Sequence, residues 1–342
     1  MSNIYLLAII TALISFISTP IVKRIAIKLN AIDIPKDERR VHKKPTPVMG
    51  GLAIYIAFVL GVILYNGILT TSQLGIIIGA TIIVIGGVLD DIKDLRPKYK
   101  IIIQVIAAIC LLQSGIDISI LTNPFREIYP YLSIGWIHIP ITIIWIVGVT
   151  NAFNLIDGLD GLAAGVAFIS AVTLMIVSLI NGRLEAAFLT AVLSGAILGF
   201  LPYNSNPASI FMGDTGSQLL GFLLAAISIE GAIKSATVFV IAVPILIFGL
   251  PLYDTLFAMI RRKVNGKSIM QADKGHLHHR LLNMGLSQKQ AVIIMYLISA
   301  VLGGIAIVAM QLSNQRAYFL LALVMFVSVL TAWKYGIFNH KE

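Results

Sequence analysis

Long apolar stretches alternate with short polar ones along the whole chain. Eleven of these apolar stretches approach the length that a helix needs to cross a bilayer, about 20 residues. They cover residues 3–22, 48–66, 73–89, 101–116, 137–150, 162–180, 186–202, 216–231, 236–260, 288–312 and 317–334. Because a helix satisfies its own backbone hydrogen bonds in lipid, the pattern predicts an all-α, polytopic membrane bundle of one domain. Pro244 and Pro251 predict a bend or break in the ninth stretch.

Basic residues orient the predicted bundle. Cytoplasmic connections of membrane proteins are enriched in Lys and Arg. If the segment after the first stretch is cytoplasmic, that side holds the connections 23–47, 90–100, 151–161, 203–215 and 261–287. It then carries all but four of the 25 Lys and Arg residues, the exceptions being Arg126, Arg183, Lys234 and Arg316. The N-terminus is therefore predicted outside and the C-terminus in the cytoplasm.

Composition supports the membrane class. The chain is 58% hydrophobic and only 12% charged, with a mean hydropathy of +0.93. A soluble domain carries about twice that charge. Cys110 is the only cysteine, which excludes an intrachain disulfide. No basic residue precedes the first apolar run, and no small-residue cleavage site follows it, so we expect a retained first span rather than a cleaved signal peptide.

The stretch NAFNLIDGLDG at 151–161 lies between two long apolar runs. Polar side chains beside hydrocarbon are costly and commonly mark a functional site. Oxygen donors at this density suit a hard cation such as Mg²⁺. The alternative is an ordinary polar turn, since Asn, Asp and Gly are turn residues. Its candidate site residues are two amides, two carboxylates and a glycine: Asn151, Asn154, Asp157, Asp160 and Gly158.

Two further acidic motifs fall on the same predicted side. In DDIKDLRPKYK, the carboxylates of Asp90, Asp91 and Asp94 precede several cations that include Lys100. Interleaved carboxylates and cations suit a phosphate–metal site, although a mixed-charge surface loop is the alternative. In FMGDTGS, Asp214 stands between two glycines at the start of a span. Asp214 is expected either to bind a metal or to serve as the helix cap, a role that Thr215 could also fill.

Three more groups carry candidate chemistry. Asp254, in PLYDT, lies inside the ninth stretch and should face the bundle interior, where it serves the site. The alternative is a structural salt bridge within the bundle. The motif ADKGHLHHRL suits phosphate and sugar oxygens better than zinc, because it has an arginine and no cysteine. The basic segment before PTPVMGG would attract anionic lipid headgroups, each charge contributing roughly 1 kcal/mol of binding free energy. The alternative is that these charges only determine the membrane topology. Their candidate residues are His276, His278, His279 and Arg280, and His42, Lys43 and Thr46.

Taken in order, these motifs resemble those of the polyprenyl-phosphate N-acetylhexosamine-1-phosphate transferase family, glycosyltransferase family 4. The resemblance runs from about residue 35 to 285. It implies transfer of a sugar-1-phosphate from a UDP-sugar to a membrane polyprenyl phosphate, with release of UMP and a requirement for Mg²⁺, which Mn²⁺ could replace. HLHHR is similar to the motif of the branch that transfers GlcNAc-1-phosphate, which implies UDP-GlcNAc and undecaprenyl phosphate as substrates. The resemblance also implies a plasma-membrane location, a cytoplasmic active site and a homodimer.

The resemblance and the motifs together divide the site residues into three sets. Asp214 and Asn154 are predicted to hold Mg²⁺. The predicted catalytic set comprises Asp90, Asp91, Asp94, Asp157, Asp160 and His279. The predicted substrate-binding set comprises Lys100, Asn151, Gly158, Asp254, His276, His278, Arg280, His42, Lys43 and Thr46. Asp90 and Asp91 would bind or deprotonate the acceptor phosphate, or help to place the metal.

Three alternatives to this function stay open. The branch that uses UDP-MurNAc-pentapeptide carries a longer histidine run followed by an aromatic residue and Glu, from which this sequence departs. A transporter would place its carboxylates near mid-membrane in broken helices. An intramembrane aspartyl protease would need only two aspartates in hydrophobic surroundings, which leaves the other motifs without a role.

Overall fold

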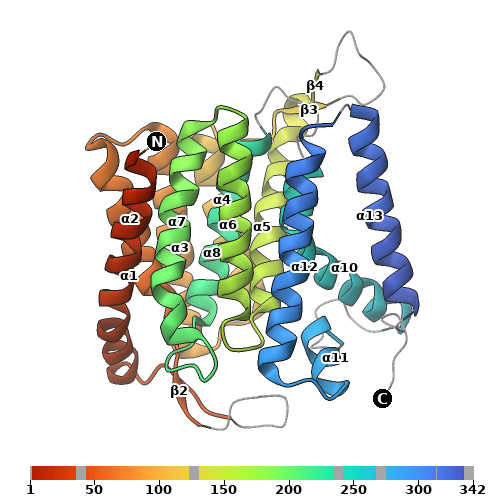
Figure 1. Cartoon of the computed structure of the whole chain (residues 1–342). Helices are drawn as coiled ribbons and strands as arrows, with labels where there is room; N and C mark the ends of the chain where they lie inside the picture. Colours follow the sequence, from red (N-terminus) through yellow and green to blue (C-terminus); the bar gives the residue numbers. More distant parts are fainter. Residues whose placement is uncertain are drawn as a thin grey trace.

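The structure is a computed structural model that describes residues 2–35, 44–122, 131–233, 242–266, 275–312 and 314–334. Helices dominate these residues (Figure 1). They are α1 Ser2–Lys28, α2 Gly51–Asn66, α3 Thr71–Lys93, α4 Pro97–Gln113, α5 His138–Ile156, α6 Leu162–Ile180, α7 Leu184–Asn204, α8 Gly213–Ser228, α9 Ala242–Ile247, α10 Gly249–Val264, α11 Leu277–Asn283, α12 Gln288–Ala309 and α13 Asn314–Lys334. Two short antiparallel pairs join β1 Ile32–Asp33 to β2 Thr46–Pro47 and β3 Ile120–Thr122 to β4 Tyr131–Ser133.

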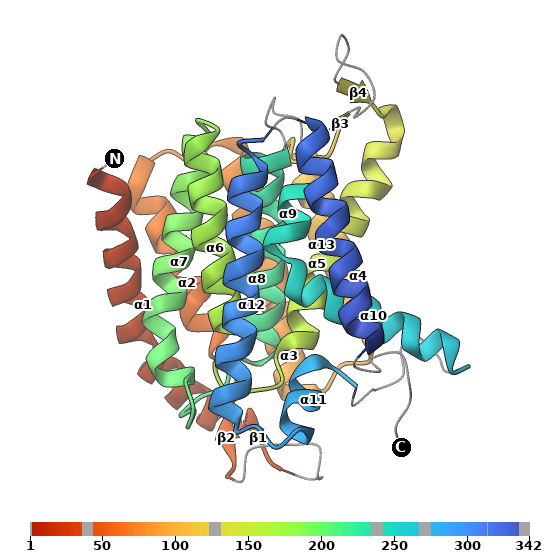
Figure 2. The ribbon, with the colours of Figure 1, turned by 45° about the vertical axis from the view of Figure 1, so that its right-hand side comes forward.

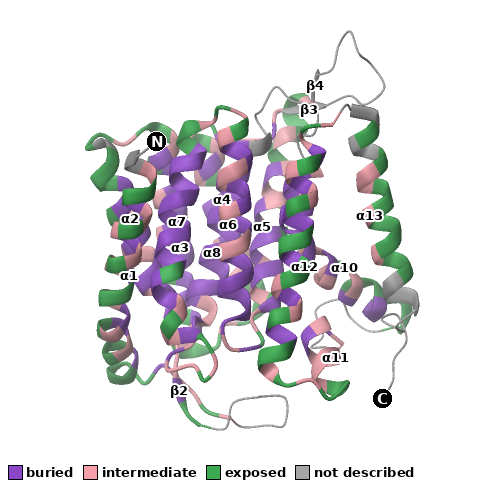
Figure 3. Cartoon of the chain, viewed as in Figure 1, coloured by how far each residue is buried: buried purple, intermediate pink, exposed green. Residues whose placement is uncertain are grey.

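Six helical segments among the described residues are long and apolar enough to cross a membrane. They are Ile4–Lys28, Thr71–Lys93, Gly135–Ile156, Leu162–Ile180, Leu184–Asn204 and Gln288–Ala309. Many large hydrophobic residues of α1 and α13 are exposed, while the helices at the centre are buried (Figure 3). The chain is therefore an integral membrane protein of the all-α, polytopic class. The count of eleven spans and the orientation stay predictions.

Helix α8 forms the centre of the bundle. It contacts α2, α3, α5, α6 and α7, and every residue from Thr215 to Ser228 is buried. Its start packs directly on two backbones, because glycines leave room for close approach. A Cβ at Gly51 would lie 2.1 Å from the Gly216 Cα, and a Cβ at Gly87 would lie 2.4 Å from the Thr215 Cα. Helices α2 and α3 thus hold the beginning of α8 in a fixed position.

Several helices extend past the apolar stretches into the predicted connections. Helix α3 ends only at Lys93 and α4 begins at Pro97, so the connection predicted at 90–100 shrinks to residues 94–96. The predicted connections 151–161 and 203–215 shrink in the same way, to 157–161 and 205–212. The apolar pattern underestimated these helices because polar residues at a helix end still make the backbone hydrogen bonds of the helix. The motif residues therefore lie mostly on helix ends.

The predicted break in the ninth stretch is confirmed. Helix α9 ends at Ile247 and α10 begins at Gly249, with Pro244 and Pro251 on either side of the break. Helix α10 then runs at a steep angle to its upright neighbours and extends outward from the bundle (Figures 1 and 2). The strands β1 and β2 and helix α11 lie at one end of the bundle, and β3, β4 and the N-terminus lie at the other. The motifs therefore gather at a single end.

The close contact between α2 and α8 can be tested with Gly51→Ala. Its methyl group would meet the backbone of α8, so we expect a loss of about 1–3 kcal/mol in the free energy of unfolding. Thermal unfolding of the detergent-solubilised protein would measure this loss. Gly304→Ala in α12 is the matched control, because a Cβ there meets nothing within 4 Å. An unchanged melting temperature for Gly51→Ala would contradict the packing described.

Candidate active site

A cleft of about 590 Å³ opens at the end of the bundle that carries the motifs. Its lining comes from segments far apart in the sequence, including β1, the end of α3 and the start of α8. Ten predicted site residues line it: Asp90, Asp91, Asp94, Lys100, Asn154, Asp157, Gly158, Asp160, Asp214 and His279. The structure thus brings together most of the three acidic motifs in one place.

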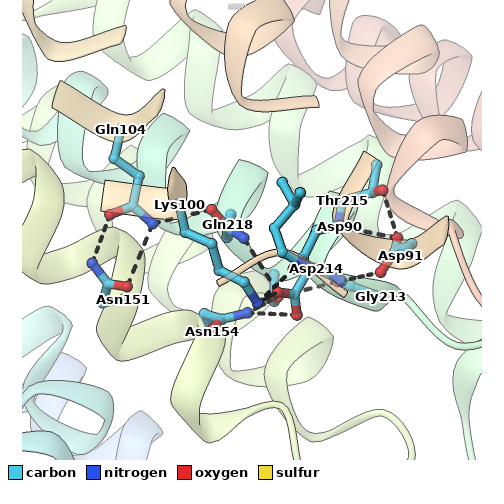
Figure 4. A network of polar contacts seen from close by, with 12 residues as sticks. Asp90, Asp91, Lys100, Gln104, Asn151, Asn154, Gly213, Asp214, Thr215 and Gln218 are labelled. Atoms are coloured by element: carbon cyan, nitrogen blue, oxygen red, sulfur yellow. Dashed lines mark hydrogen bonds and ion pairs between the residues drawn. The ribbon is translucent and has the colours of Figure 1, made fainter. Parts of the chain in front are cut away.

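Lys100 joins two of the carboxylates at the centre of the cleft (Figure 4). Its Nζ lies 2.5 Å from Asp90 Oδ2 and also contacts Asp214 Oδ2. The other oxygen of Asp90, Oδ1, accepts a hydrogen bond of 2.7 Å from the backbone N–H of Leu95. Three helices therefore meet through one cation: α3 carries Asp90, α4 carries Lys100 and α8 carries Asp214.

Asp214 is also held by two amides. Asn154 Nδ2 donates to Asp214 Oδ1 over 2.9 Å and to Ser217 Oγ over 2.9 Å. Gln218 Nε2 donates to Asp214 Oδ2 over 3.3 Å. The predicted metal pair, Asp214 and Asn154, is therefore adjacent in the structure, one residue on α8 and the other near the end of α5.

Asp91 caps helix α8 from the neighbouring helix α3. Its Oδ1 accepts the backbone N–H of Asp214 over 2.8 Å, and its Oδ2 accepts the Thr215 backbone N–H and hydroxyl, over 3.3 and 2.6 Å. Gly213 makes room for this contact, since a Cβ there would lie 2.4 Å from Asp91 Oδ2. The N-cap residue Met212 makes no side-chain hydrogen bond. The prediction that Asp214 or Thr215 caps α8 is therefore wrong, and a carboxylate from α3 satisfies the free N–H groups and the helix dipole.

Asp157 and Asp160 occupy the short connection between α5 and α6. Asp160 Oδ2 accepts from Asn206 Nδ2 over 2.9 Å and from the Ala208 backbone N–H over 3.0 Å. Asn206 Nδ2 also donates to Gln288 Oε1 over 2.7 Å. Asp160 therefore ties the connection 205–212, and through it the start of α12, to the cleft wall.

Negative charge is in large excess in the cleft. Seven aspartates line it, and Lys100 is the only Lys or Arg among the described lining residues. Burial, and then the charges of Asp214, Asp91 and Asp160, raise the pKa of Asp157 from 3.8 to about 8. Crowded carboxylates with an amide oxygen nearby are the donors that a hard divalent cation prefers. As placed, however, no three His, Cys, Asp or Glu side chains of the described residues converge on one point.

The histidine motif divides into anchoring and cleft residues. His276 Nδ1 lies 2.8 Å from Asp254 Oδ2, and the Leu277 backbone N–H donates to Asp254 Oδ1 over 2.9 Å, so Asp254 holds the start of α11. His278 is buried against Gly158, where a Cβ would lie 2.3 Å from its Nε2. Burial, and then the neighbouring His279, lower the pKa of His278 to about 3, so it is neutral. His279 lines the cleft.

The remaining predicted substrate residues do not line the cleft. Asp254, His276 and His278 seat α11, Arg280 Nε donates to the Gly275 carbonyl over 3.0 Å, and Thr46 belongs to β2. Asn151 pairs with the side chain of Gln104 instead of facing the cleft. His42 and Lys43 lie outside the described residues. The contact of Asp254 with His276 is of the kind expected for a structural pair within the bundle.

The motifs did not indicate several polar residues that support the site. Gln104 and Gln218 are almost fully buried inside the bundle, and Gln288 and Asn206 brace Asp160. Gln104 stands in an otherwise apolar stretch, IIIQVIAAIC. An amide inside an apolar membrane span itself indicates a functional or packing role. This was the one sequence signal that could have pointed to Gln104.

The fold and the cleft together define a polytopic helical membrane protein whose acidic site is suited to cation-assisted phosphate chemistry. Residues 73–232 match the family model described as glycosyl transferase family 4. The chain is 43% identical over its full length to a "probable undecaprenyl-phosphate N-acetylglucosaminyl 1-phosphate transferase" of Bacillus subtilis, of which it covers 94%. It therefore belongs to the polyprenyl-phosphate N-acetylhexosamine-1-phosphate transferase family, which confirms the resemblance and displaces the transporter and protease interpretations.

Two further relatives show the breadth of the family. The chain is 35% identical, over an alignment that covers 85% of its length, to a "decaprenyl-phosphate N-acetylglucosaminephosphotransferase" of Mycolicibacterium smegmatis, of which it covers 78%. It is 29% identical, over an alignment that covers 87% of its length, to a "phospho-N-acetylmuramoyl-pentapeptide-transferase" of Halalkalibacterium halodurans, of which it covers 94%. Of these three relatives, the two named for N-acetylglucosamine have the higher identity to this chain.

The charge crowding around Asp157 predicts a pH-dependent stability. With a pKa of about 8 in the folded protein and an ordinary value of 3.8, the folded state holds the proton more tightly than the unfolded state. The protein should therefore lose stability as the pH rises from about 4 to 8. The side chain of Asp157→Asn cannot ionise. The melting temperature of this variant, relative to that of the wild type, should therefore rise between pH 5 and pH 8 when both are measured without divalent cations.

The matched control is Asp117→Asn, which removes a carboxylate near β3 at the other end of the bundle. Its melting temperature should follow that of the wild type at every pH. A difference between Asp157→Asn and wild type that stays constant with pH would contradict the crowding of charge at Asp157.

Proposed function

We propose that this protein transfers N-acetylglucosamine-1-phosphate from UDP-GlcNAc to undecaprenyl phosphate and releases UMP. The observation that carries the proposal is the cluster of Asp90, Lys100, Asn154 and Asp214 in a cleft at the end of a membrane bundle. A lipid-borne phosphate and a soluble nucleotide can meet only at such an end. The full-length similarity to a relative named for this reaction supports the same donor and acceptor.

The reaction is a phosphoryl transfer whose atoms balance simply. An oxygen of the acceptor phosphate forms a bond to the β-phosphorus of UDP-GlcNAc. The bond between that phosphorus and the bridging oxygen breaks, and the oxygen leaves with UMP. Little covalent chemistry falls to the protein, so catalysis consists of positioning and of stabilising charge. A phosphate monoester has a second pKa near 6, so a dedicated base adds little.

The cleft residues take roles that follow from their contacts. Bound Mg²⁺, or Mn²⁺ in its place, would neutralise the diphosphate, and Asp214 and Asn154 are the residues proposed to hold it. Lys100 supplies positive charge to a phosphate. Asp91 keeps Asp214 in place by capping α8, and Asp90 keeps Lys100 within the cleft. His279 contributes a polar group to the same cleft.

The cellular setting follows from the same proposal. The basic connections predict that the cleft faces the cytoplasm, where UDP-sugars are dissolved. Transfer to a membrane lipid would then be the first membrane step of a cell-wall glycan, such as a teichoic acid or an O-antigen. A homodimer remains a further expectation from the family.

The donor can be tested with purified protein, undecaprenyl phosphate and Mg²⁺. We expect UMP release from UDP-GlcNAc and none from UDP-MurNAc-pentapeptide, because the full-length match of 43% identity is to a relative named for N-acetylglucosamine. Chelation of the divalent cation should stop the release. UMP released only from the pentapeptide donor would move the protein to the other branch of the family.

The site assignment predicts graded losses of UMP release. Asp214→Asn removes a proposed metal ligand and should lower turnover by at least about 100-fold. Asp91→Asn keeps one acceptor oxygen for α8 and should lower it by about 10–100-fold. Asp117→Asn, beside β3, should retain wild-type turnover. Near-wild-type turnover of Asp214→Asn would overturn the assignment of Asp214.

A further inference from the structure

A chain of three amides, two of them buried, leads from the interior of the bundle to Asp214 (Figure 4). Asn151 on α5 donates from Nδ2 to Gln104 Oε1 over 2.6 Å. Gln104 on α4 donates from Nε2 to Gln218 Oε1 over 3.0 Å, and Gln218 on α8 donates from Nε2 to Asp214 Oδ2 over 3.3 Å. Each link crosses from one element to the next, except the last, which joins residues four apart on α8.

These amides lie in surroundings where polar groups are costly. Gln104 is fully buried and Gln218 is 3% exposed. The other hydrogen-bonding positions of Asn151 are also satisfied. Its Nδ2 donates a second bond to the Val147 carbonyl over 2.8 Å, and its Oδ1 accepts from Gln104 over 3.4 Å. A satisfied amide network offsets its desolvation, whereas a broken one leaves a buried donor or acceptor without a partner.

The network has a direction that simple helix-to-helix adhesion does not require. The three shorter links point their N–H groups toward Asp214, so each of these bonds polarises the next and strengthens the final donor, while the 3.4 Å bond from Gln104 Nε2 to Asn151 Oδ1 runs the other way. That donor meets a carboxylate oxygen in the cleft rather than a backbone carbonyl. Together with Lys100, which contacts the same Oδ2, this donor fixes the rotation of the Asp214 carboxylate, with Oδ2 toward Gln218 and Oδ1 toward Asn154.

We propose that Gln104, Gln218 and Asn151 are positioning residues that set the Asp214 carboxylate for divalent-cation binding from within the membrane-embedded core. This proposal rests on the proposed function, since it assigns a task to Asp214 in that reaction. It also gives Asn151 a role different from the predicted contact with substrate. Gln104 and Asn151 act only through Gln218, so the three amides form one unit.

The test uses Gln218→Met and Gln104→Met in the full-length, detergent-solubilised protein. Methionine nearly matches the volume of glutamine and favours helix, but it cannot donate a hydrogen bond. The probe is Mn²⁺, whose binding is followed by electron paramagnetic resonance without any substrate. Gln218→Met loses a hydrogen bond to a charged group, and Gln104→Met loses the donor that orients Gln218, so each variant should raise the Kd for Mn²⁺ by about tenfold. The double variant should bind Mn²⁺ no more weakly than Gln218→Met alone, because both changes break one chain.

Trp145→Phe provides the matched control. Trp145 Nε1 donates to Ser228 Oγ over 3.2 Å and to the Ala225 carbonyl over 3.3 Å, so it joins the same helices α5 and α8 without leading to Asp214. We expect this variant to melt at a lower temperature while its Kd for Mn²⁺ stays unchanged. If Gln218→Met folds poorly, Gln218→Glu keeps an acceptor for Gln104 while it removes the donor to Asp214.

Two results would overturn the proposal. One is an unchanged Kd for Mn²⁺ in Gln218→Met. The other is a double variant whose loss of Mn²⁺ affinity equals the sum of the two single losses in free energy. UMP release by the wild type, measured separately, tests the proposed function itself. An active wild type with an unchanged Gln218→Met therefore rejects the amide chain alone, while an inactive wild type rejects the proposed function.

Discussion

The cap that Asp91 places on helix α8 is the interaction on which the rest of the site depends. It fixes the first N–H groups of a helix that is otherwise wholly buried, and so it sets where Asp214 lies. Glycines make this contact feasible, because a side chain at Gly213 would collide with the Asp91 carboxylate. A charge from α3 thus supports the carboxylate of α8, and the two aspartates have different tasks although both line the cleft.

The cleft combines a rigid floor with an excess of charge. Backbone contacts at Gly51 and Gly87 hold α8 from one side, and the amide chain that ends at Gln218 holds it from another. Within this frame, aspartates face each other with Lys100 as their main counter-charge. A site that is crowded with carboxylates before any substrate arrives is organised for a cation and for the phosphates that the cation neutralises.

Helix α11 shows how the histidine motif contributes at a distance. Asp254, beyond the break at Phe248, binds His276 and the backbone of Leu277. These hydrogen bonds fix the start of α11 against α10, beside the cleft. His278 then packs against Gly158. One motif therefore serves two purposes, since two of its histidines build the wall and His279 lines the cleft.

The sequence alone determined the membrane class, the broken ninth stretch and ten of the residues that line the cleft, because apolar runs and clustered charges are local signals. Only the tertiary structure decided which partner each polar group meets. Asp91 caps α8, and Asn151 hydrogen-bonds to a chain of amides. Gln104 and Gln218 belong to that chain although neither was predicted from the sequence as a site residue. These contacts join residues more than 40 positions apart, and a local pattern carries no information about such distant partners.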